Sequence, residues 1–508
     1  MLSSSISPAS IAFAMLCSLL PLTLVDAMAA NPSLQERAIS GCYPVAPNNT
    51  GGTIVPVKTG KTPQGFYSAP RGWNSWAIQI NPKTTPSAPS DLSPLTNQAF
   101  IIEQCSVLAD PDILAAGYDL CSLDGGWYGN VTDQYGRVTY DDTRFDIPKL
   151  ATYLHSKGLK LGLYNMPNLP CEAADKNIYG HDIKVGTTFN GVEDKYGLCY
   201  FNYTHPNTQL YHNSLIDLWA SWGADMIKLD YITPGSNVGD YGVPADTSGA
   251  AIAYHRAIIN NGRQIRLDLS SNICRNEPYL EIWEGTSDSI RLAVDINNQH
   301  STAFVGMWKV QGTIEQYRLY INQLVLDKKL MIARPDFDNL FVGNQASVSG
   351  ITDGQRITIM SHWIGAAANL IIGSDMTNLD GLGRKLLTST TALQAADFCG
   401  KLPMQPRNPG TGSNQAKQLQ AWVAGPSTIG QAYVLLTNLG PDLGRGGYAT
   451  VATGAQTVSI TLSDLGLTGS KYLVRDVWSG NSTTVAAGGS LSAVLGEGES
   501  QFLRLTFA

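Results

Sequence analysis

The sequence has few charged residues, and the acidic ones outnumber the basic ones. Charged residues make up 15% of the 508 residues, with 34 Lys and Arg against 41 Asp and Glu, for a formal net charge of −7. A nucleic-acid-binding protein presents a basic surface to phosphates, so that class of protein is disfavoured. The sequence also has no C-x-x-C pair, and its seven histidines form no H-E-x-x-H motif, so we expect no metal site.

Long apolar runs are lacking too, apart from one near the N-terminus. Ile11–Val25 is apolar, and Ala27, Ala29 and Ala30 supply the small residues typical of a signal-peptide cleavage site. We therefore predict a signal peptide over residues 1–29, secretion and no membrane span, with a membrane anchor as the alternative. Four N-x-[ST] sequons fit a secreted glycoprotein: Asn48, Asn130, Asn202 and Asn481.

Cysteine is present in a number that constrains its pairing. The sequence has eight cysteines, of which Cys17 lies in the predicted signal peptide. The remaining seven are an odd number, so at least one stays outside any disulfide. In an oxidising compartment we expect disulfide bonds among the others. Cys171 and Cys199 could close one loop, but the sequence does not determine the pairing.

The composition is sufficient for a large core, with 43% hydrophobic residues, 22 Tyr and 10 Trp. Residues 30–65 are rich in Pro, Gly, Asn and Thr and are interpreted as an N-terminal extension. Over residues 66–390, eight short apolar runs alternate with helical patterns, which predicts a (β/α)8 TIM barrel. Residues 391–508 carry short strand patterns between Gly, Ser and Asn turns, which predicts a C-terminal antiparallel β-sandwich.

The barrel prediction depends on the positions of these runs. They lie at residues 72–76, 118–123, 159–164, 225–229, 265–269, 289–294, 330–333 and 370–373. One intervening helix is marked by a stripe at i, i+4, i+7 and i+11 that ends at Gly223: Tyr211, Leu215, Leu218 and Trp222.

The polar residues that end the runs are the candidate site, because a TIM barrel carries its active site at the carboxyl ends of its strands. Asp124, Asp230 and Asp295 follow three of the runs, and Lys228 and Arg291 lie within two of them. Burying a carboxylate without a partner costs folding free energy. The number of carboxylates at strand ends is therefore hard to explain by folding alone. Two carboxylates across one pocket suit glycoside hydrolysis, in which one attacks the anomeric carbon and the other protonates the leaving oxygen.

Other residues near the strand ends allow two interpretations. Aromatic faces suit the C–H faces of sugars, and four aromatic residues are candidates for the barrel mouth: Trp73, Trp76, Trp127 and Tyr164. Trp73 and Trp127 fit the core equally well. Three further acids near the last strands are interpreted as structural or as supporting the site residues rather than as catalytic: Asp336, Asp338 and Asp375.

The motifs, taken in order, resemble glycoside hydrolase family 27, the melibiase or α-galactosidase family of clan D. The likeness covers roughly residues 66–508, and the order of its segments is more specific than any one of them. The segments are Gly72-Trp73-Asn74-Ser75-Trp76, Ala116-Gly117-Tyr118 with Leu123-Asp124, residues 155–164, Lys228-Leu229-Asp230, Arg291 with Asp295, Asp336-Phe337-Asp338, residues 371–375 and residues 472–478.

The resemblance implies a retaining exo-α-glycosidase that removes terminal α-D-galactosyl residues from a galactoside or related oligosaccharide, with no metal or organic cofactor. By their places in the motifs, Asp230 would be the nucleophile and Asp295 the acid/base. Their carboxyl groups would then lie about 5–5.5 Å apart. The substrate-binding residues would be Trp76, Asp124, Tyr164, Lys228, Arg291 and Ser271.

The chain departs from the family pattern at three positions. The family usually has two adjacent acids after the second strand, and Leu123 replaces the first. Ser271 lies where the family has the Glu or Ser of a C-E-W or C-S-W motif; a Ser there suits a 2-acetamido group. Ile232 replaces a cysteine two residues after the nucleophile, so the family disulfide must be absent or rewired.

These departures leave the identity of the sugar open. An α-N-acetylgalactosaminidase or a β-L-arabinopyranosidase of the same family is an alternative to an α-galactosidase. The alternative from another class is a non-catalytic carbohydrate-binding protein on a decayed barrel.

Overall fold

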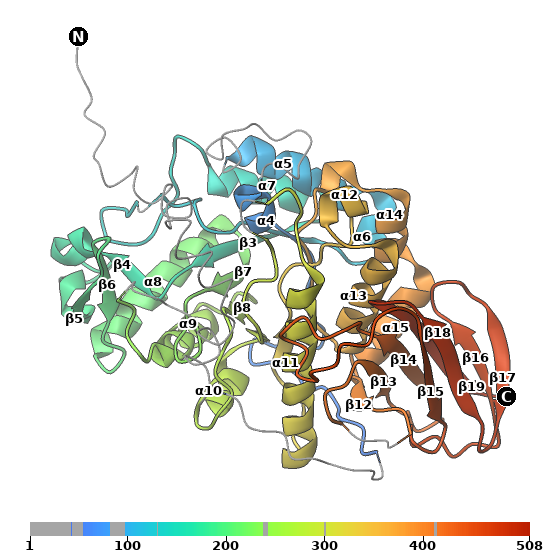
Figure 1. Cartoon of the computed structure of the whole chain (residues 1–508). Helices are drawn as coiled ribbons and strands as arrows, with labels where there is room; N and C mark the ends of the chain where they lie inside the picture. The colour runs from blue at the N-terminus through green and yellow to red at the C-terminus, as the bar shows by residue number, and fades with distance from the viewer. Residues whose placement is uncertain are drawn as a thin grey trace.

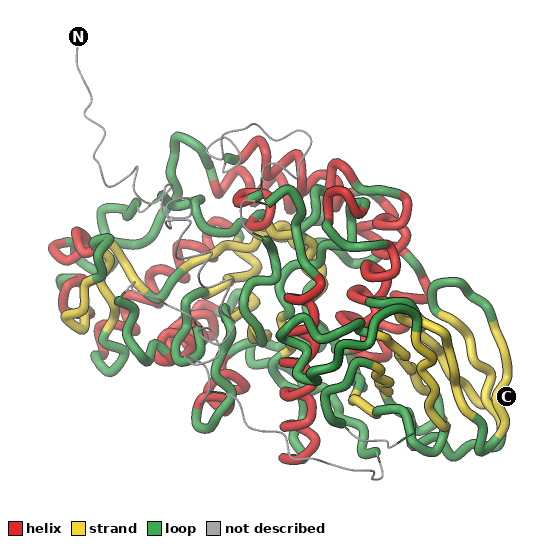
Figure 2. The backbone as a smooth tube through the Cα atoms, in the orientation of Figure 1, coloured by secondary structure: helices red, strands yellow, loops and turns green. Residues whose placement is uncertain are grey.

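The computed structural model describes residue 42 and residues 54–81, 97–129, 131–236, 242–298, 301–410 and 414–508 (Figures 1 and 2). The predicted signal peptide lies outside the described residues, as do most of the extension at 30–65 and the sequons at Asn48 and Asn130. Within the described ranges, no helix is both long and apolar enough to span a bilayer.

Eight parallel strands form the central sheet of the larger domain. Their order in the sheet is β10-β9-β8-β7-β3-β2-β1-β11. Its two outer strands meet, because the Asn369 N–H donates to the Pro335 carbonyl at 3.0 Å and Leu340 bridges Ile372 in parallel. The eight strands are β1 Arg71–Asn74, β2 Leu120–Ser122, β3 Lys160–Asn165, β7 Ala224–Leu229, β8 Arg266–Leu269, β9 Ser289–Arg291, β10 Arg334–Asp336 and β11 Leu370–Ile372. The predicted TIM barrel is confirmed.

One predicted strand position is wrong. The seventh run was expected at residues 330–333, but β10 begins at Arg334. Met331 instead pairs with the segment before the barrel: its N–H donates to the Lys58 carbonyl at 2.9 Å, and its carbonyl accepts from the Gly60 N–H at 3.0 Å. The apolar run is therefore used by the N-terminal segment, and the barrel strand starts just after it.

Helices connect the barrel strands and cover the outside of the sheet (Figure 1). The stripe predicted to end at Gly223 is confirmed in α8: Tyr211 and Leu215 are buried, and Gly223 has the left-handed φ of 99° expected at a helix end. The helices are α4 Trp76–Ile80, α5 Gln98–Ser106, α6 Pro111–Ala115, α7 Ile147–Ser156, α8 Pro206–Trp222, α9 Ser248–Asn261, α10 Tyr279–Thr286, α11 Met307–Asp327, α12 Ala346–Ser349, α13 Asp353–Gly365, α14 Gly381–Thr388 and α15 Thr390–Cys399.

A small antiparallel sheet is inserted between β3 and α8, which the strand–helix alternation did not predict. It consists of β4 Asn168–Pro170, β5 Phe189–Glu193 and β6 Leu198–Phe201, in the order β4-β6-β5. In Figure 1 it lies at the opposite end of the molecule from the C-terminal sheets. The Cys171–Cys199 disulfide joins its segments, which confirms the loop closure that the sequence allowed.

Two more disulfides join distant segments. Cys105 pairs with Cys121, linking α5 to β2, and Cys42 pairs with Cys274 across 232 residues. Cys399 is free and buried, as the odd number of cysteines requires of at least one of them.

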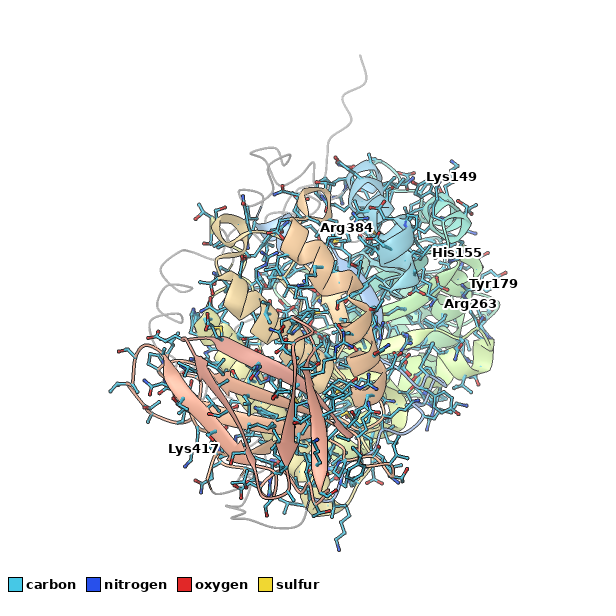
Figure 3. The ribbon with its side chains drawn as sticks, turned by 90° about the vertical axis from the view of Figure 1, so that its right-hand side faces the viewer. Lys149, His155, Tyr179, Arg263, Arg384 and Lys417 are labelled. Carbon is cyan, nitrogen blue, oxygen red and sulfur yellow. A yellow bond between two sulfur atoms is a disulfide. The ribbon has the colours of Figure 1, made fainter. Side chains whose placement is uncertain are left out.

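The C-terminal region is the predicted antiparallel sandwich, which faces the viewer in Figure 3. Its sheets have the orders β12-β13-β14-β19-β16-β17 and β15-β18, with a separate apolar core between them. The Tyr317 ring of α11 stacks on Trp422 of β13 with centroids 5.7 Å apart, so the sandwich is packed firmly on the barrel. The strands are β12 Gln405–Arg407, β13 Leu419–Ala424, β14 Ala432–Asn438, β15 Gln456–Thr461, β16 Lys471–Asp476, β17 Ser482–Ala486, β18 Ser490–Leu495 and β19 Glu499–Phe507.

Candidate active site

The strand ends bring the candidate residues to one edge of the barrel. Lys228 in β7 is in register with Tyr164 in β3, and Arg291 in β9 is in register with Asp336 in β10. Because all the strands are parallel, the segments that follow them emerge at the same face. Asp230 follows β7 directly at this face.

Asp124 and Lys228 form a buried ion pair at the base of this face. Lys228 Nζ lies 2.8 Å from Asp124 Oδ2, and both side chains are largely shielded from solvent. Gly125 N–H donates to Asp124 Oδ1 at 2.9 Å, and the Asp124 N–H donates to Ser75 Oγ at 2.9 Å. Burial alone would lower the pKa of Lys228, but the carboxylates of Asp124 and Asp230 raise it, so the ammonium stays charged.

Asp230 lies among charges of both signs. Burial raises the pKa of its carboxyl, Lys228 lowers it, and the charges of Asp295 and Asp124 raise it further, for a net raised pKa. The Tyr231 N–H donates to Asp230 Oδ1 at 2.8 Å, which supports the ionised form. Because the charge of Asp295 acts on Asp230, the two carboxyl groups lie within electrostatic reach of each other.

Arg291 connects two acids from different strand ends. Its Nη2 lies 2.6 Å from Asp295 Oδ1 and 3.0 Å from Asp338 Oδ2. Asp338 Oδ2 also accepts from the Ile296 N–H at 2.7 Å, so one buried carboxylate holds both Arg291 and the residue after Asp295. Burial raises the pKa of Asp338 to about 6, although Arg291 opposes the shift.

Asp295 is partly accessible to solvent, with 37% of its side chain exposed. Burial pushes the pKa of Asp295 upward, but the cations of Arg291, Lys228 and Lys309 outweigh it, and the net pKa is lowered.

The aromatic candidates divide into two groups. Trp73 and Trp127 are fully buried, and their indole N–H groups donate to the carbonyls of Ser374 and Tyr164, so both belong to the core. Trp76 is half-buried at the start of α4, directly after β1. Lys228 Nζ lies 5.4 Å from the centre of the Tyr164 ring, which places this tyrosine beside the ion pair.

A polar cavity inside the barrel underlies these residues. Both site cations open into it together with three carboxylates, so the floor of the site is charged. Its lining residues are Asn74, Ser122, Met226, Lys228, Asp268, Arg291, Asp336, Asp338, Asn339, Asn369 and Ile371.

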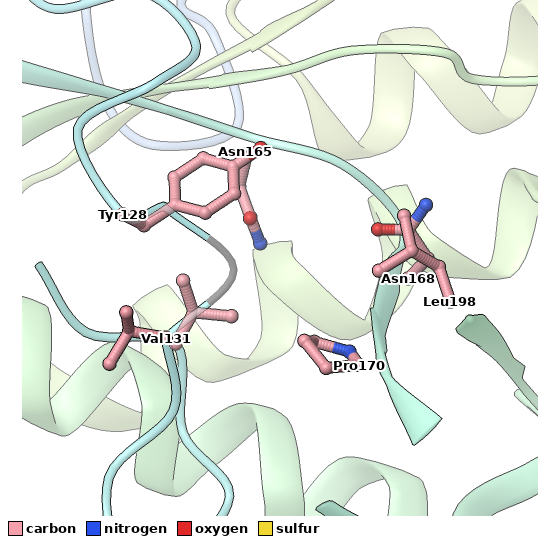
Figure 4. A pocket seen from close by; sticks show the side chains of 7 residues that line it. Tyr128, Val131, Asn165, Asn168, Pro170 and Leu198 are labelled. Carbon is pink, nitrogen blue, oxygen red and sulfur yellow. The ribbon is translucent and has the colours of Figure 1, made fainter. Parts of the chain in front are cut away.

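A second pocket adjoins the site between β3 and the inserted sheet (Figure 4). The Tyr128 ring on one side of it lies parallel to the Tyr164 ring, with centroids 6.5 Å apart and an interplanar angle of 8°. Asn168 and Leu198 lie together on the other side. Tyr164 therefore lies beside both Lys228 of the ion pair and Tyr128, which lines this pocket.

Comparisons with known proteins agree with this arrangement. The family model described as Alpha galactosidase A matches residues 69–214, and the model described as Alpha galactosidase C-terminal beta sandwich domain matches residues 416–505. Alpha-galactosidase 3 of Hypocrea jecorina is 46% identical over 495 residues, which cover 95% of this chain and 78% of that protein. A protein of Emericella nidulans whose name also places it among the alpha-galactosidases is 53% identical over 414 residues, 81% of this chain and 82% of its own length.

The chain belongs to glycoside hydrolase family 27. The crystal structure of a β-L-arabinopyranosidase of this family from Geobacillus stearothermophilus has the same fold, with a TM-score of 0.69 at 20% identity over 87% of this chain and 98% of that one. Membership makes this chain an enzyme, a glycoside hydrolase, and the non-catalytic alternative falls away.

Two positions at which this family 27 chain departs from the family pattern have distinct surroundings. Leu123 is 1% exposed and packs in the hydrophobic core, so it presents no polar group to the site. Ser271 follows β8, where its N–H donates to Ser236 Oγ at 3.1 Å and its carbonyl accepts from that hydroxyl at 2.6 Å. The loops after β7 and β8 are thus tied together at Ser271.

The structure adds residues to the site that the sequence did not single out. Lys309, at the start of α11, contributes a cation to the surroundings of Asp295, and Ser75 holds the backbone of Asp124. Asp338 was interpreted as structural or as supporting the site rather than as catalytic, and its 3.0 Å contact with Arg291 is a supporting contact of this kind. No spacing in the sequence marks Lys309, because it meets Asp295 only after the β9–α11 loop has folded back.

Proposed function

We propose that this chain is a secreted retaining exo-α-galactosidase. The observation that carries the proposal is the pair Asp230 and Asp295 at one barrel face, each within the electrostatic reach of Lys228 and of the other. The two relatives named as alpha-galactosidases, at 46% and 53% identity, support α-galactosides as the substrate class.

The proposed first step forms a glycosyl-enzyme. A carboxylate oxygen of Asp230 attacks the anomeric carbon as the bond from that carbon to the leaving oxygen breaks, and Asp295 gives its proton to that oxygen. In the second step the oxygen of a water molecule attacks the anomeric carbon as the ester bond to Asp230 breaks, and Asp295 takes the proton that the water gives up. Galactose then leaves with its original configuration.

The neighbouring residues bind the sugar in this proposal. Lys228 and Arg291 donate to ring hydroxyls, Asp124 accepts from a far hydroxyl, and Tyr164 and Trp76 contact the apolar face of the ring. Burial and the nearby Asp230 raise the pKa of Tyr164, so its hydroxyl remains a donor. Since Leu123 lies in the core, Asp124 alone provides a carboxylate after β2.

Ser271 supports a second candidate, an α-N-acetylgalactosaminidase, because a Ser in its motif suits a 2-acetamido group. A β-L-arabinopyranosidase is the third candidate.

Purified protein should be tested on aryl α-galactoside, α-N-acetylgalactosaminide and β-L-arabinopyranoside, with proton NMR following the first sugar released. We expect fastest release of galactose, seen first as the α-anomer. Faster release of another sugar would change the substrate class, and the β-anomer appearing first would contradict retention.

Lys309 gives a test of the electrostatics around the acid/base. The charged groups around Asp295 are Arg291, Lys228, Lys309, Asp230 and Asp338. Since the Lys309 cation lowers the pKa of Asp295, Lys309→Met should raise that pKa. The bell-shaped pH profile of kcat/KM belongs to the coupled pair of carboxyl groups, so it should move to higher pH. Lys309→Arg keeps the cation and should retain the original profile; a shift to lower pH in Lys309→Met would contradict this placement.

Secretion is supported by three disulfide bonds, which persist in oxidising compartments. Of the sequons within the described residues, Asn481 is exposed and Asn202 is half-buried. We propose Asn481 as a glycan acceptor on the sandwich.

A further inference from the structure

A loop of the sandwich is anchored on the barrel beside the site. Residues 439–449, between β14 and β15, run next to α11 (Figure 1). Gln311 of α11 is buried and donates from Nε2 to the carbonyls of Leu439 and Pro441, both at 2.9 Å. Its Oε1 accepts from the Leu443 N–H at 3.0 Å. One side chain of the barrel therefore fixes the path of this loop.

The shape of the loop is also fixed from within. The carboxylate of Asp442 accepts from the backbone N–H groups of Gly444, Gly446, Tyr448 and Ala449, at 2.8 to 3.1 Å. A carboxylate that collects several backbone donors holds a turn in one conformation. The residue at the centre of this turn, Arg445, is therefore held in a defined place.

Arg445 points at the first turns of α11. Its guanidinium carbon lies 4.7 Å from the centre of the Trp308 ring, a cation–π contact. A Cβ added to Gly312 would lie 3.2 Å from Cβ and Cδ of Arg445, so the helix carries glycine where the arginine passes. In a βα unit of a barrel the helix begins at the catalytic face, and α11 is the helix that follows β9.

Trp308 contacts Lys309, the residue whose charge acts on Asp295. Lys309 Nζ lies 5.3 Å from the centre of the Trp308 ring and donates to the Asn297 carbonyl at 2.5 Å, two residues beyond Asp295. Burial lowers the pKa of Lys309, Asp295 and Asp338 raise it, and Arg445 lowers it again. Arg445 and Asp295 thus act on the same ammonium from two domains.

We propose that Arg445, held by Trp308, binds the leaving group of the substrate, so that the sandwich supplies part of the leaving-group subsite. The inference rests on the proposed function, in which Asp295 protonates the leaving oxygen. A leaving group must then extend past Asp295, and the contacts from Lys309 to Trp308 and from Trp308 to Arg445 lead away from that acid. Arg445 is half-buried, and a guanidinium carries several N–H donors in a fixed planar arrangement, a geometry that suits the hydroxyls of a sugar leaving group.

The test compares two leaving groups of different size. α-Galactosyl fluoride has a single-atom leaving group that cannot reach Arg445, whereas an α-galactosyl disaccharide has a sugar there. We expect Arg445→Ala to lower the ratio of kcat/KM for the disaccharide to kcat/KM for the fluoride by about tenfold, as loss of a charge-assisted hydrogen bond predicts. Trp308→Ala should lower the same ratio, and Trp308→Phe, which keeps an aromatic face, should restore most of it.

The controls separate this inference from the proposed function. Arg475→Ala removes an exposed arginine of the same sandwich and should leave the ratio unchanged. If the unaltered enzyme hydrolyses neither galactoside, the proposed function fails. If it hydrolyses both, and the folded Arg445 and Trp308 variants keep the original ratio, the leaving-group subsite is refuted. Circular dichroism and melting temperature establish folding; should Arg445→Ala not fold, Trp308→Phe against Trp308→Ala decides.

Discussion

Asp230→Asn should abolish turnover of α-galactosides almost completely, with kcat/KM reduced by about 10⁴-fold or more. The amide is similar in size to the carboxyl but cannot form the glycosyl ester, so the first step has no nucleophile. Lys228 retains its 2.8 Å contact with Asp124, so the fold should persist with little change in melting temperature. The measurement is steady-state hydrolysis of an aryl α-galactoside, with melting followed on the same sample.

Azide makes this prediction specific to the role of Asp230. Asp230→Gly leaves a space from which azide can attack the anomeric carbon in place of the carboxylate. The expected product is β-galactosyl azide, of inverted configuration. Asp397→Asn, which changes an exposed acid far from the site, should behave as the unaltered enzyme. Full hydrolytic activity in Asp230→Asn would refute the assignment of the nucleophile.

The second large effect is expected at Asp295. Asp295→Asn removes the group that protonates the leaving oxygen, so kcat/KM should fall by roughly 10²–10⁴-fold for a disaccharide. α-Galactosyl fluoride needs no proton for departure, and its kcat/KM should fall much less. Arg291 keeps its partner Asp338 at 3.0 Å, so the substitution leaves no isolated buried charge.

Azide also distinguishes the roles of Asp230 and Asp295. In Asp295→Asn the nucleophile remains, so azide should attack the glycosyl-enzyme in place of activated water. The product is then α-galactosyl azide, with retained configuration, in contrast to the β-azide of Asp230→Gly. Equal losses on the disaccharide and the fluoride would show that Asp295 does not act as the proton donor.

In the sugar-free site, the pKa shifts of Asp230 and Asp295 are opposite to those expected for a nucleophile and a proton donor. The pKa of Asp230 is raised, first by burial, and that of Asp295 is lowered, because cations outweigh burial. Arg291 is the largest of these cationic influences on Asp295. Ring hydroxyls that take up the donors of Arg291 would weaken its hold on Asp295, so sugar binding itself would prepare the acid.

Local pattern was enough to predict much of the fold. Strand-length apolar runs ending in Asp124 and Asp230 fixed where the chain turns from strand to loop, and the α8 stripe ended at the Gly223 expected. The run at 330–333 was wrongly assigned to the barrel because an apolar strand pattern does not determine which strand it pairs with. Met331 pairs with Lys58 and Gly60 outside the barrel. The inserted sheet, β4 to β6, was not predicted because its strands do not all carry a buried apolar run: in β5, four of the five residues are exposed.

The site was predictable only in part for a similar reason. Acids at strand ends can be recognised in the sequence, because each follows its own apolar run. Lys309 and Arg445 cannot, because a loop brings Lys309 near Asp295 and a contact between domains brings Arg445 to Trp308, and no sequence periodicity encodes either arrangement. Trp73 and Trp127 show the converse: their places beside strands suggested the mouth or the core, and only their buried N–H donors to Ser374 and Tyr164 decide for the core.

The most direct measurement is to locate the covalent intermediate. 5-Fluoro-α-galactosyl fluoride combines a good leaving group with a fluorine that destabilises positive charge at the anomeric carbon, so the glycosyl-enzyme should accumulate. Proteolysis and tandem mass spectrometry of the inactivated protein should find the sugar ester on Asp230, and none should form in Asp230→Asn. An adduct on another carboxylate, or complete turnover with inversion and no adduct, would contradict the account.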